Sequence, residues 1–303
     1  MLGATQVRIR IADITFALVG LTREWTWTDQ DRFEAFTGEG ASDILLNVHA
    51  GDGCSQLSSA DMVYSVEGLR NVYLCEDRWA FEFHPYKRLL YPQRPPHQVL
   101  IFDRRFTEGD LYVSADSASE RHPFSFGLFL PELLSDMLPF YSGMMLHASG
   151  ISHEGRGIVF AGPSGAGKST IAGLWQRRDG IGVLNDDRMI VRKKGEQWWA
   201  YPAAGMGELG PDSTQAAVLE AVFLVSHSQQ NLAERMGMAQ AASSLLPHIS
   251  LPPYDAVAVS LGLDLLDDLL QKVPVYQLGF LPDDSAIDCI KGTIPWGEDG
   301  SRP

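Results

Sequence analysis

The sequence predicts an α/β protein in which a β-rich amino-terminal region precedes a domain built around a phosphate-binding loop. Residues 162–170, here called the phosphate loop, read Gly-Pro-Ser-Gly-Ala-Gly-Lys-Ser-Thr and contain the G-x-x-x-x-G-K-S pattern of a P-loop. An apolar run at 157–161 precedes the loop and a segment without proline follows it to residue 177, which predicts a strand before the loop and a helix after it. Residues 1 to about 122 instead show short apolar or alternating runs between turn residues, a pattern typical of antiparallel β-structure.

The elements expected along the chain define its domains. In the amino-terminal part, strand-like runs lie at 7–21, 43–48, 62–66, 71–75, 79–83, 99–102 and 111–114. An apolar stripe at helical spacing over 126–138, followed by Pro139, predicts a helix that links the two parts. Further on, strands are expected at 182–184, 189–191, 197–201, 221–225 and 273–280, and helices at 239–246, 261–270 and 284–290. The predicted organisation is a β-rich region 1–125, a linking helix within 126–142, an α/β domain 143–291 and a frayed tail 292–303.

Composition restricts the possible partners and the compartment. The chain has 303 residues and a formal net charge of −14, whereas nucleic-acid backbones are bound by excess Lys and Arg. No apolar run approaches the roughly 20 residues that span a bilayer, and no small-residue cleavage site follows the apolar stretch near the amino end. The 3 cysteines show no C-x-x-C spacing and indicate neither a disulfide framework nor a zinc site. We expect a cytoplasmic protein without nucleic-acid or membrane partners.

The β-rich region shows no catalytic constellation, but its aromatic residues permit two interpretations. Trp25, Trp27, Phe81, Phe83 and Tyr86 could form a face that recognises a partner. Aromatic residues at strand spacing are more often part of a core. The region is therefore a candidate recognition domain without an identified site.

The phosphate loop is the candidate nucleotide site. Its glycines let the backbone direct N–H groups toward an anion, and the helix that follows directs its positive end to the same place. Lys168 is expected to reach the β- and γ-phosphates and Ser169 to hold Mg²⁺. The candidate nucleotide contacts are Gly162, Pro163, Ser164, Gly165, Ala166, Gly167, Lys168, Ser169 and Thr170. The alternative is a glycine-rich turn that binds no ligand.

Asp186 and Asp187, here called the acid pair, are the candidate acids. They follow a predicted strand expected to lie beside the phosphate loop, at the edge where open α/β sheets place ligands. Two adjacent carboxylates near a triphosphate repel one another unless Mg²⁺ or a lysine compensates them, which favours different tasks for the two. The alternative is an ordinary polar turn. His147 lies 15 positions before Gly162, and on its own a histidine between apolar residues is more often structural than catalytic.

The order and spacing of these segments resemble the catalytic domain of HPr kinase/phosphorylase and its kinase-like relatives. The matching segments are 147–150, 155–158, 162–169 and 186–187, and the resemblance covers roughly residues 140 to 290. It implies a core like that of phosphoenolpyruvate carboxykinase and the transfer of phosphate from a nucleotide to a serine hydroxyl. It also implies that Asp186 is the base toward the serine, that Asp187 helps to hold the metal and that His147 supports both. HPr kinases are hexamers, so the resemblance further implies a homo-oligomer.

One later segment departs from the family pattern. The family has a Glu-x-Arg-Gly-x-Gly-like signature after the acid pair, and the nearest stretch here, Gly-Met-Gly-Glu-Leu-Gly at 205–210, lacks the arginine. Glu208 in this stretch is a candidate metal or substrate ligand, the alternative being a solvated loop acid. Arg235 could contact phosphate across a subunit boundary, although a surface arginine is the commoner interpretation.

The sequence therefore favours an ATP- and Mg²⁺-dependent kinase that acts on a serine-type hydroxyl of a small protein or peptide. The alternatives are a nucleotide-binding switch or scaffold without transfer activity, a small-molecule phosphotransferase and a carboxykinase-like enzyme.

Overall fold

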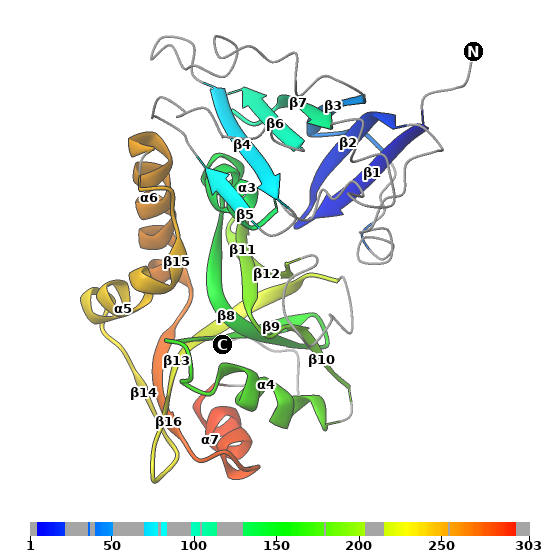
Figure 1. Ribbon diagram of the computed structural model, residues 1–303. Helices are drawn as coiled ribbons and strands as arrows, with labels where there is room; N and C mark the ends of the chain where they lie inside the picture. The colour runs from blue at the N-terminus through cyan, green and yellow to red at the C-terminus, as the bar shows by residue number, and fades with distance from the viewer. Residues whose placement is uncertain are drawn as a thin grey trace. The chain divides into compact units, whose positions relative to one another are not determined.

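The computed structural model describes residues 5–21, 36, 40–50, 70–77, 80–83, 98–103, 105–113, 130–178, 180–203, 215–253 and 255–294. The chain divides into two compact units, Met1–Met137 and Leu138–Pro303 (Figure 1). Within the described residues, one sheet lies in each unit and five α-helices accompany them, so the protein is of mixed α/β class.

The division between the units falls inside the predicted linking helix. Helix α3 spans Leu130–Met137 and continues directly into the 3₁₀-helix η3, Leu138–Tyr141. As the sequence predicts, the α-helix ends just before Pro139, but helical structure continues through this proline as a 3₁₀ turn. A proline is tolerated in the first turn of a helix because the N–H that it lacks would have no partner there.

In the described part of the first unit, seven strands form a mixed sheet. Its strands are β1 (Thr5–Ile11), β2 (Ile14–Leu21), β3 (Ile44–Ala50), β4 (Arg70–Asp77), β5 (Ala80–Phe83), β6 (Gln98–Asp103) and β7 (Glu108–Val113), and their order in the sheet is β1-β2-β3-β7-β6-β4-β5. Ile9, Phe16 and Ile44 lie opposite one another on neighbouring strands and are fully buried.

The antiparallel arrangement expected for this unit is only partly correct, because β3 runs parallel to both β2 and β7. Parallel neighbours need a long crossover, and the chain between these strands is long enough to supply one. Apolar periodicity carries no information on strand direction, so the error could not be avoided. The strand expected at 62–66, Trp25, Trp27, Tyr86 and the side chains of Phe81 and Phe83 lie outside the described residues.

The second unit contains a nine-stranded sheet with four α-helices among its described residues. The strands are β8 (Gly143–His153), β9 (Arg156–Ala161), β10 (Ile181–Asn185), β11 (Arg188–Lys194), β12 (Gln197–Pro202), β13 (Ala217–His227), β14 (Leu232–Arg235), β15 (Ile249–Ser250) and β16 (Val275–Phe280). The helices are α4 (Lys168–Gln176), α5 (Met238–Leu245), the 3₁₀-helix η4 (Leu246–His248), α6 (Ala256–Lys272) and α7 (Ser285–Thr293). Each element predicted between residues 157 and 290 is present, while β8, β14 and β15 were not predicted.

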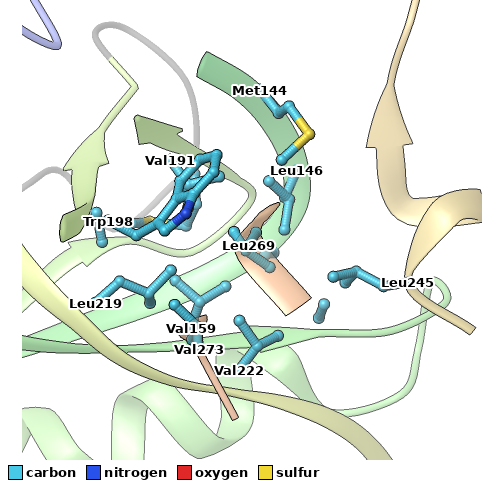
Figure 2. Packing of buried hydrophobic residues seen from close by; sticks show 14 of the residues in the cluster. Met144, Leu146, Val159, Val191, Trp198, Leu219, Val222, Leu245, Leu269 and Val273 are labelled. Atoms are coloured by element: carbon cyan, nitrogen blue, oxygen red, sulfur yellow. The ribbon is translucent and has the colours of Figure 1, made fainter. Parts of the chain in front are cut away.

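Helices cover both faces of this sheet. Along β9, Val159 packs into a cluster with residues of α5 and α6, whereas its neighbour Phe160 packs into a second cluster with residues of α4 and α7. Alternate residues of a strand point to opposite faces, so β9 contributes to both cores. Figure 2 shows the first cluster, in which Trp198 and Leu219 from the strands lie near Leu269 of α6. Strand β9, which precedes the phosphate loop, is therefore packed between two helical layers, and this packing fixes where the loop begins.

Candidate functional site

The phosphate loop leaves β9 at the carboxyl end of that strand and leads directly into α4. Gly165 and Gly167 adopt φ values of +78° and +98°, which are costly for residues with a Cβ atom. Gly167 is the N-cap of α4, and no side chain caps this helix, which lies wholly within the described residues. By contrast, Asp255 caps α6 by accepting hydrogen bonds from Val257 and Ala258 N–H. The amino end of α4 therefore presents N–H groups that a bound anion could satisfy.

Lys168 is folded back onto the phosphate loop. Its Nζ donates hydrogen bonds of 3.0 Å to the carbonyl oxygens of Gly162 and Pro163, and the side chain is almost fully buried. Burial lowers the pKa of Lys168, the charge of Asp187 opposes this shift, and the charge of Arg188 adds a smaller lowering effect. The hydrogen-bond partners are neutral carbonyls, so the ammonium charge is available to an anionic ligand in the loop.

The acid pair lies between two consecutive strands, β10 and β11, that pair with the same strand, β8. Strands β10 and β11 both pair antiparallel with β8, with Asn185 opposite Gly150 and Arg188 opposite His147, so they follow one another along it. The acid pair is the break between them, where the Ala148 N–H still donates to the Asp187 carbonyl over 3.0 Å. The strand before the acid pair was expected beside the phosphate loop. It is instead separated from β9 by β8, because β8 pairs with both.

One side-chain hydrogen bond joins the acid pair to the start of α4, and two further side chains hold each of these segments in place. Ser169 Oγ donates to the Asp186 carbonyl oxygen over 3.3 Å, and Ser149 Oγ donates to the Lys168 carbonyl oxygen over 2.8 Å. Asn185 is fully buried, and its Oδ1 accepts hydrogen bonds of 2.9 Å from the N–H groups of Asp187 and Arg188. The acid pair therefore lies beside the phosphate loop even though its strand does not pair with β9.

The two acids occupy different environments. Asp186 is 8% exposed, whereas the side chain of Asp187 is 46% exposed. Asp187 Oδ1 lies 3.9 Å from His147 Nε2, and its Oδ2 lies 3.4 Å from Arg188 Nε. Burial and then the charge of Lys168 lower the pKa of His147, against an opposing effect of Asp187, which favours the neutral form of the imidazole.

The structure brings together most of the predicted site residues. His147, Lys168, Ser169, Asp186 and Asp187 all lie where β8 meets the start of α4. Arg235 is exposed on β14, a strand at the edge of the sheet, and is not part of this group. Glu208 lies outside the described residues.

In the described ranges, no group of three His, Cys, Asp or Glu side chains could hold a metal by itself. Mg²⁺ does not need such a group, because proteins commonly hold it through one or two carboxylates together with substrate phosphates. Asp187 and Ser169 are the oxygen donors that the site could supply.

Several residues near the site were not predicted. Ser149 and Arg188 lie within or next to the motifs, so their positions in the sequence could have identified them. Asn185 is visible only as a polar residue at the end of a strand. His248 precedes β15, which pairs with β8, and burial and then the charge of Lys168 lower its pKa. Only the fold shows that His248 lies within electrostatic reach of Lys168.

Comparisons with known proteins give a limited match. The model of a family described as "SynChlorMet cassette protein ScmC" matches residues 134–251, less than half of the chain. Among solved structures, the HPr(Ser) kinase/phosphatase from Coxiella burnetii is a weak neighbour with 11% identity and a TM-score of 0.28, covering 49% of this chain and 95% of that one. No curated protein matches the sequence. None of the described helices is long and apolar enough to cross a membrane.

Proposed function

We propose that this protein is a kinase that binds ATP with Mg²⁺ in the phosphate loop and transfers the terminal phosphoryl group to a serine-type hydroxyl of a small protein or peptide. The observation that carries the proposal is the hydrogen bond from Ser169 to the Asp186 carbonyl, which fastens the acid pair to the end of α4 that follows the loop. Phosphoryl transfer depends mainly on positioning and electrostatics, and this arrangement provides both.

The phosphate loop and Lys168 form the binding half of the proposed site. The uncapped amino end of α4 offers N–H groups to the phosphates, and Lys168 supplies a buried positive charge. Upon nucleotide binding, the Lys168 ammonium exchanges the neutral carbonyls of Gly162 and Pro163 for phosphate oxygens. Charge-assisted hydrogen bonds are stronger than neutral ones, which favours this exchange.

The acid pair forms the reacting half of the proposed site. Asp186 takes the proton of the attacking hydroxyl, and the more exposed Asp187 holds the metal with Ser169. Bound Mg²⁺ neutralises charge on the phosphate oxygens. The Ser169 hydroxyl uses its hydrogen toward the Asp186 carbonyl, so its lone pairs are free to coordinate a cation. His147, neutral and 3.9 Å from Asp187 Oδ1, supports that carboxylate.

The order of the motifs, which resembles that of HPr kinases, supports a protein or peptide acceptor and a homo-oligomer as further parts of the proposal. A specific feature favours one alternative, a nucleotide-binding switch without transfer activity. The segment at 205–210 lacks the arginine of the family signature. A switch would bind Mg·ATP and label no acceptor.

The test is transfer of label from γ-labelled ATP to a panel of serine-containing peptides. The kinase proposal requires a product whose label survives acid and is lost in strong base.

Lys168→Ala and Asp186→Asn should each reduce turnover by roughly 100-fold or more, since each removes a charge that acts in the transition state. Lys194→Ala and Asp264→Asn are matched controls, because both residues are exposed and lie outside the site. Unchanged transfer in the Lys168 or Asp186 variant would refute the role assigned to that residue, and Mg·ATP binding without any labelled product would favour the switch.

A further inference from the structure

We propose that His227 is a positioning residue that fixes the shape of the phosphate loop by holding the carbonyl group of Gly165. The inference rests on the proposed function, because it assigns His227 to the nucleotide site. His227 was not predicted as a site residue. It lies 57 positions after the end of the phosphate loop at residue 170 and belongs to no recognised motif.

The strand register places His227 at the level of the loop. Strand β13 runs parallel to β9, with Leu224 opposite Ala161, the last residue of β9. β13 continues for three residues beyond Leu224 and ends at His227, while the other chain has already turned into the phosphate loop. The acid pair lies on the opposite flank, because β8 pairs with the other edge of β9. Side chains therefore reach the loop from both sides of β9.

The His227 ring is held in a defined orientation. Its Nε2 lies 3.0 Å from the Gly165 carbonyl oxygen. A carbonyl can only accept, so Nε2 carries the hydrogen and donates it. The ring stacks on Phe280, with centroids 5.8 Å apart and an interplanar angle of 28°. Phe280 is fully buried and lies opposite His227 in the β13–β16 pairing, so a rigid platform supports the donor.

The rings of His227 and Phe280 also lie against Gly167, which has a positive φ. A Cβ atom at Gly167 would lie 2.6 Å from Phe280 Cζ and 3.2 Å from His227 Cε1. The loop backbone is thus in close contact with both rings where it turns into α4. His227 therefore acts at two consecutive points, through a hydrogen bond at Gly165 and through packing at Gly167.

The hydrogen bond from His227 becomes more important when the loop is occupied. In the structure, Lys168 holds the carbonyls of Gly162 and Pro163. An anion that draws the Lys168 ammonium toward itself removes those two bonds. The bond from His227 does not involve that ammonium, so it can keep the loop in shape while the ligand is bound. A preformed loop binds phosphates more tightly because less conformational freedom is lost on binding.

The test compares the binding of Mg·ATP and of inorganic tripolyphosphate to the full-length protein by calorimetry. His227→Phe keeps an aromatic ring beside Phe280 but cannot donate to Gly165, and His227→Gln restores an N–H donor. We expect His227→Phe to weaken both ligands by a similar factor, about fivefold, as for the loss of one hydrogen bond. His227→Gln should recover part of that loss. His153→Phe, at the far end of β8, is the control for a histidine-to-phenylalanine change and should bind both ligands like the wild type.

Each result has a definite meaning. Equal binding of both ligands by the wild type and His227→Phe would overturn the inference, and weaker binding of ATP alone would overturn it in favour of a contact with the base. If His227→Phe melts well below the wild type, the comparison of His227→Gln with His227→Leu decides the question in the same way. Failure of the wild-type protein to bind either ligand would refute the proposed function itself, and the inference with it.

Discussion

Ser169 Oγ donates a hydrogen bond to the backbone carbonyl of Asp186, over 3.3 Å and across 17 positions of sequence. This bond joins the first turn of α4 to the break between β10 and β11, and so connects the helix end that follows the phosphate loop to the acid pair. The bond from Ser149 to the Lys168 carbonyl joins the same helix end to β8. The proposed binding half and reacting half are therefore directly connected, which favours the fixed geometry that positioning chemistry requires.

Removal of the Ser169 hydroxyl should weaken Mg·ATP binding. Ser169→Ala loses the bond to the Asp186 carbonyl and an oxygen ligand for the metal, and we expect about tenfold weaker binding. Ser169→Thr keeps the hydroxyl and should bind close to the wild type. Ser243→Ala is a suitable control, because the Ser243 hydroxyl bonds only within α5 in the described hydrogen bonds. The measurement is calorimetric titration with Mg·ATP, and equal affinities for the Ala and Thr variants would contradict the prediction.

Substitution of Asn185 should destabilise the protein and disturb the acid pair. Asn185→Ala leaves the N–H groups of Asp187 and Arg188 and the Ala203 carbonyl without their partner, and we expect the free energy of unfolding to fall by about 2–3 kcal/mol. Asn231→Ala, which removes bonds from a more exposed amide, should cost less. Urea unfolding monitored by tryptophan fluorescence measures both.

The variant Asn185→Asp tests how a buried negative charge at this position affects stability. The aspartate keeps an acceptor for the two N–H groups but loses the donor to Ala203 and introduces a negative charge beside the acid pair. Burial of an unpaired carboxylate is costly, so this variant should regain stability when acid neutralises it. A loss of stability that does not depend on pH would show that the charge is irrelevant.

The local parts of this site could be predicted from the sequence, and the non-local parts could not. The strand before the phosphate loop and the helix after it depend on neighbouring residues, and both lie where predicted, as β9 and α4. Strand β8 was missed because it is buried on both faces over most of its length and shows no alternation. The periodicity of a strand does not show which strand it pairs with. The pairing of β10 and β11 with β8, on either side of the acid pair, was therefore also missed.

The same limit explains the residues that reach the site from far along the chain. His227 and His248 belong to no motif, and each approaches the phosphate loop or Lys168 only through the pairing of its strand or its neighbouring strand. Asn185 shows how weak the signal can be, because a buried asparagine at a strand end has the same sequence appearance as a solvated turn residue.

Stability should decrease below neutral pH because of two half-buried histidines, His147 and His248. Burial, aided by the charge of Lys168, lowers the pKa of His147 and His248 from the ordinary value of 6.5. Above that value both rings are neutral in the folded and the unfolded chain. As the pH falls below it, the unfolded chain takes up protons first, so the free energy of unfolding decreases until the folded pKa is passed. The measurement is urea unfolding between about pH 5.5 and 7.5, a range chosen to lie above most carboxylate titrations.

The double variant His147→Gln/His248→Gln provides the control for that experiment. It lacks both titrating rings, so its stability should change less over the same pH range. An anion in the phosphate loop offsets the charge of Lys168, and therefore Mg·ATP should reduce the acid sensitivity of the wild type. An identical pH dependence for the wild type and the double variant would show that other groups cause the decrease.

Three glycines around α4 should respond differently to alanine. Gly167→Ala places a Cβ atom 2.6 Å from Phe280 Cζ at a φ of +98°, so it should lower stability by more than about 2 kcal/mol and weaken Mg·ATP binding. At Gly165, with φ +78° and no atom within 4 Å of the added Cβ, only backbone strain applies, and the cost should be about 1–2 kcal/mol. Gly173 lies inside α4 with no atom within 4 Å of the added Cβ, so alanine should raise stability by about 0.5–1 kcal/mol without changing binding. Thermal unfolding and Mg·ATP titration of the three variants test this order, and a Gly167→Ala protein as stable as the wild type would show that the loop is not packed against Phe280.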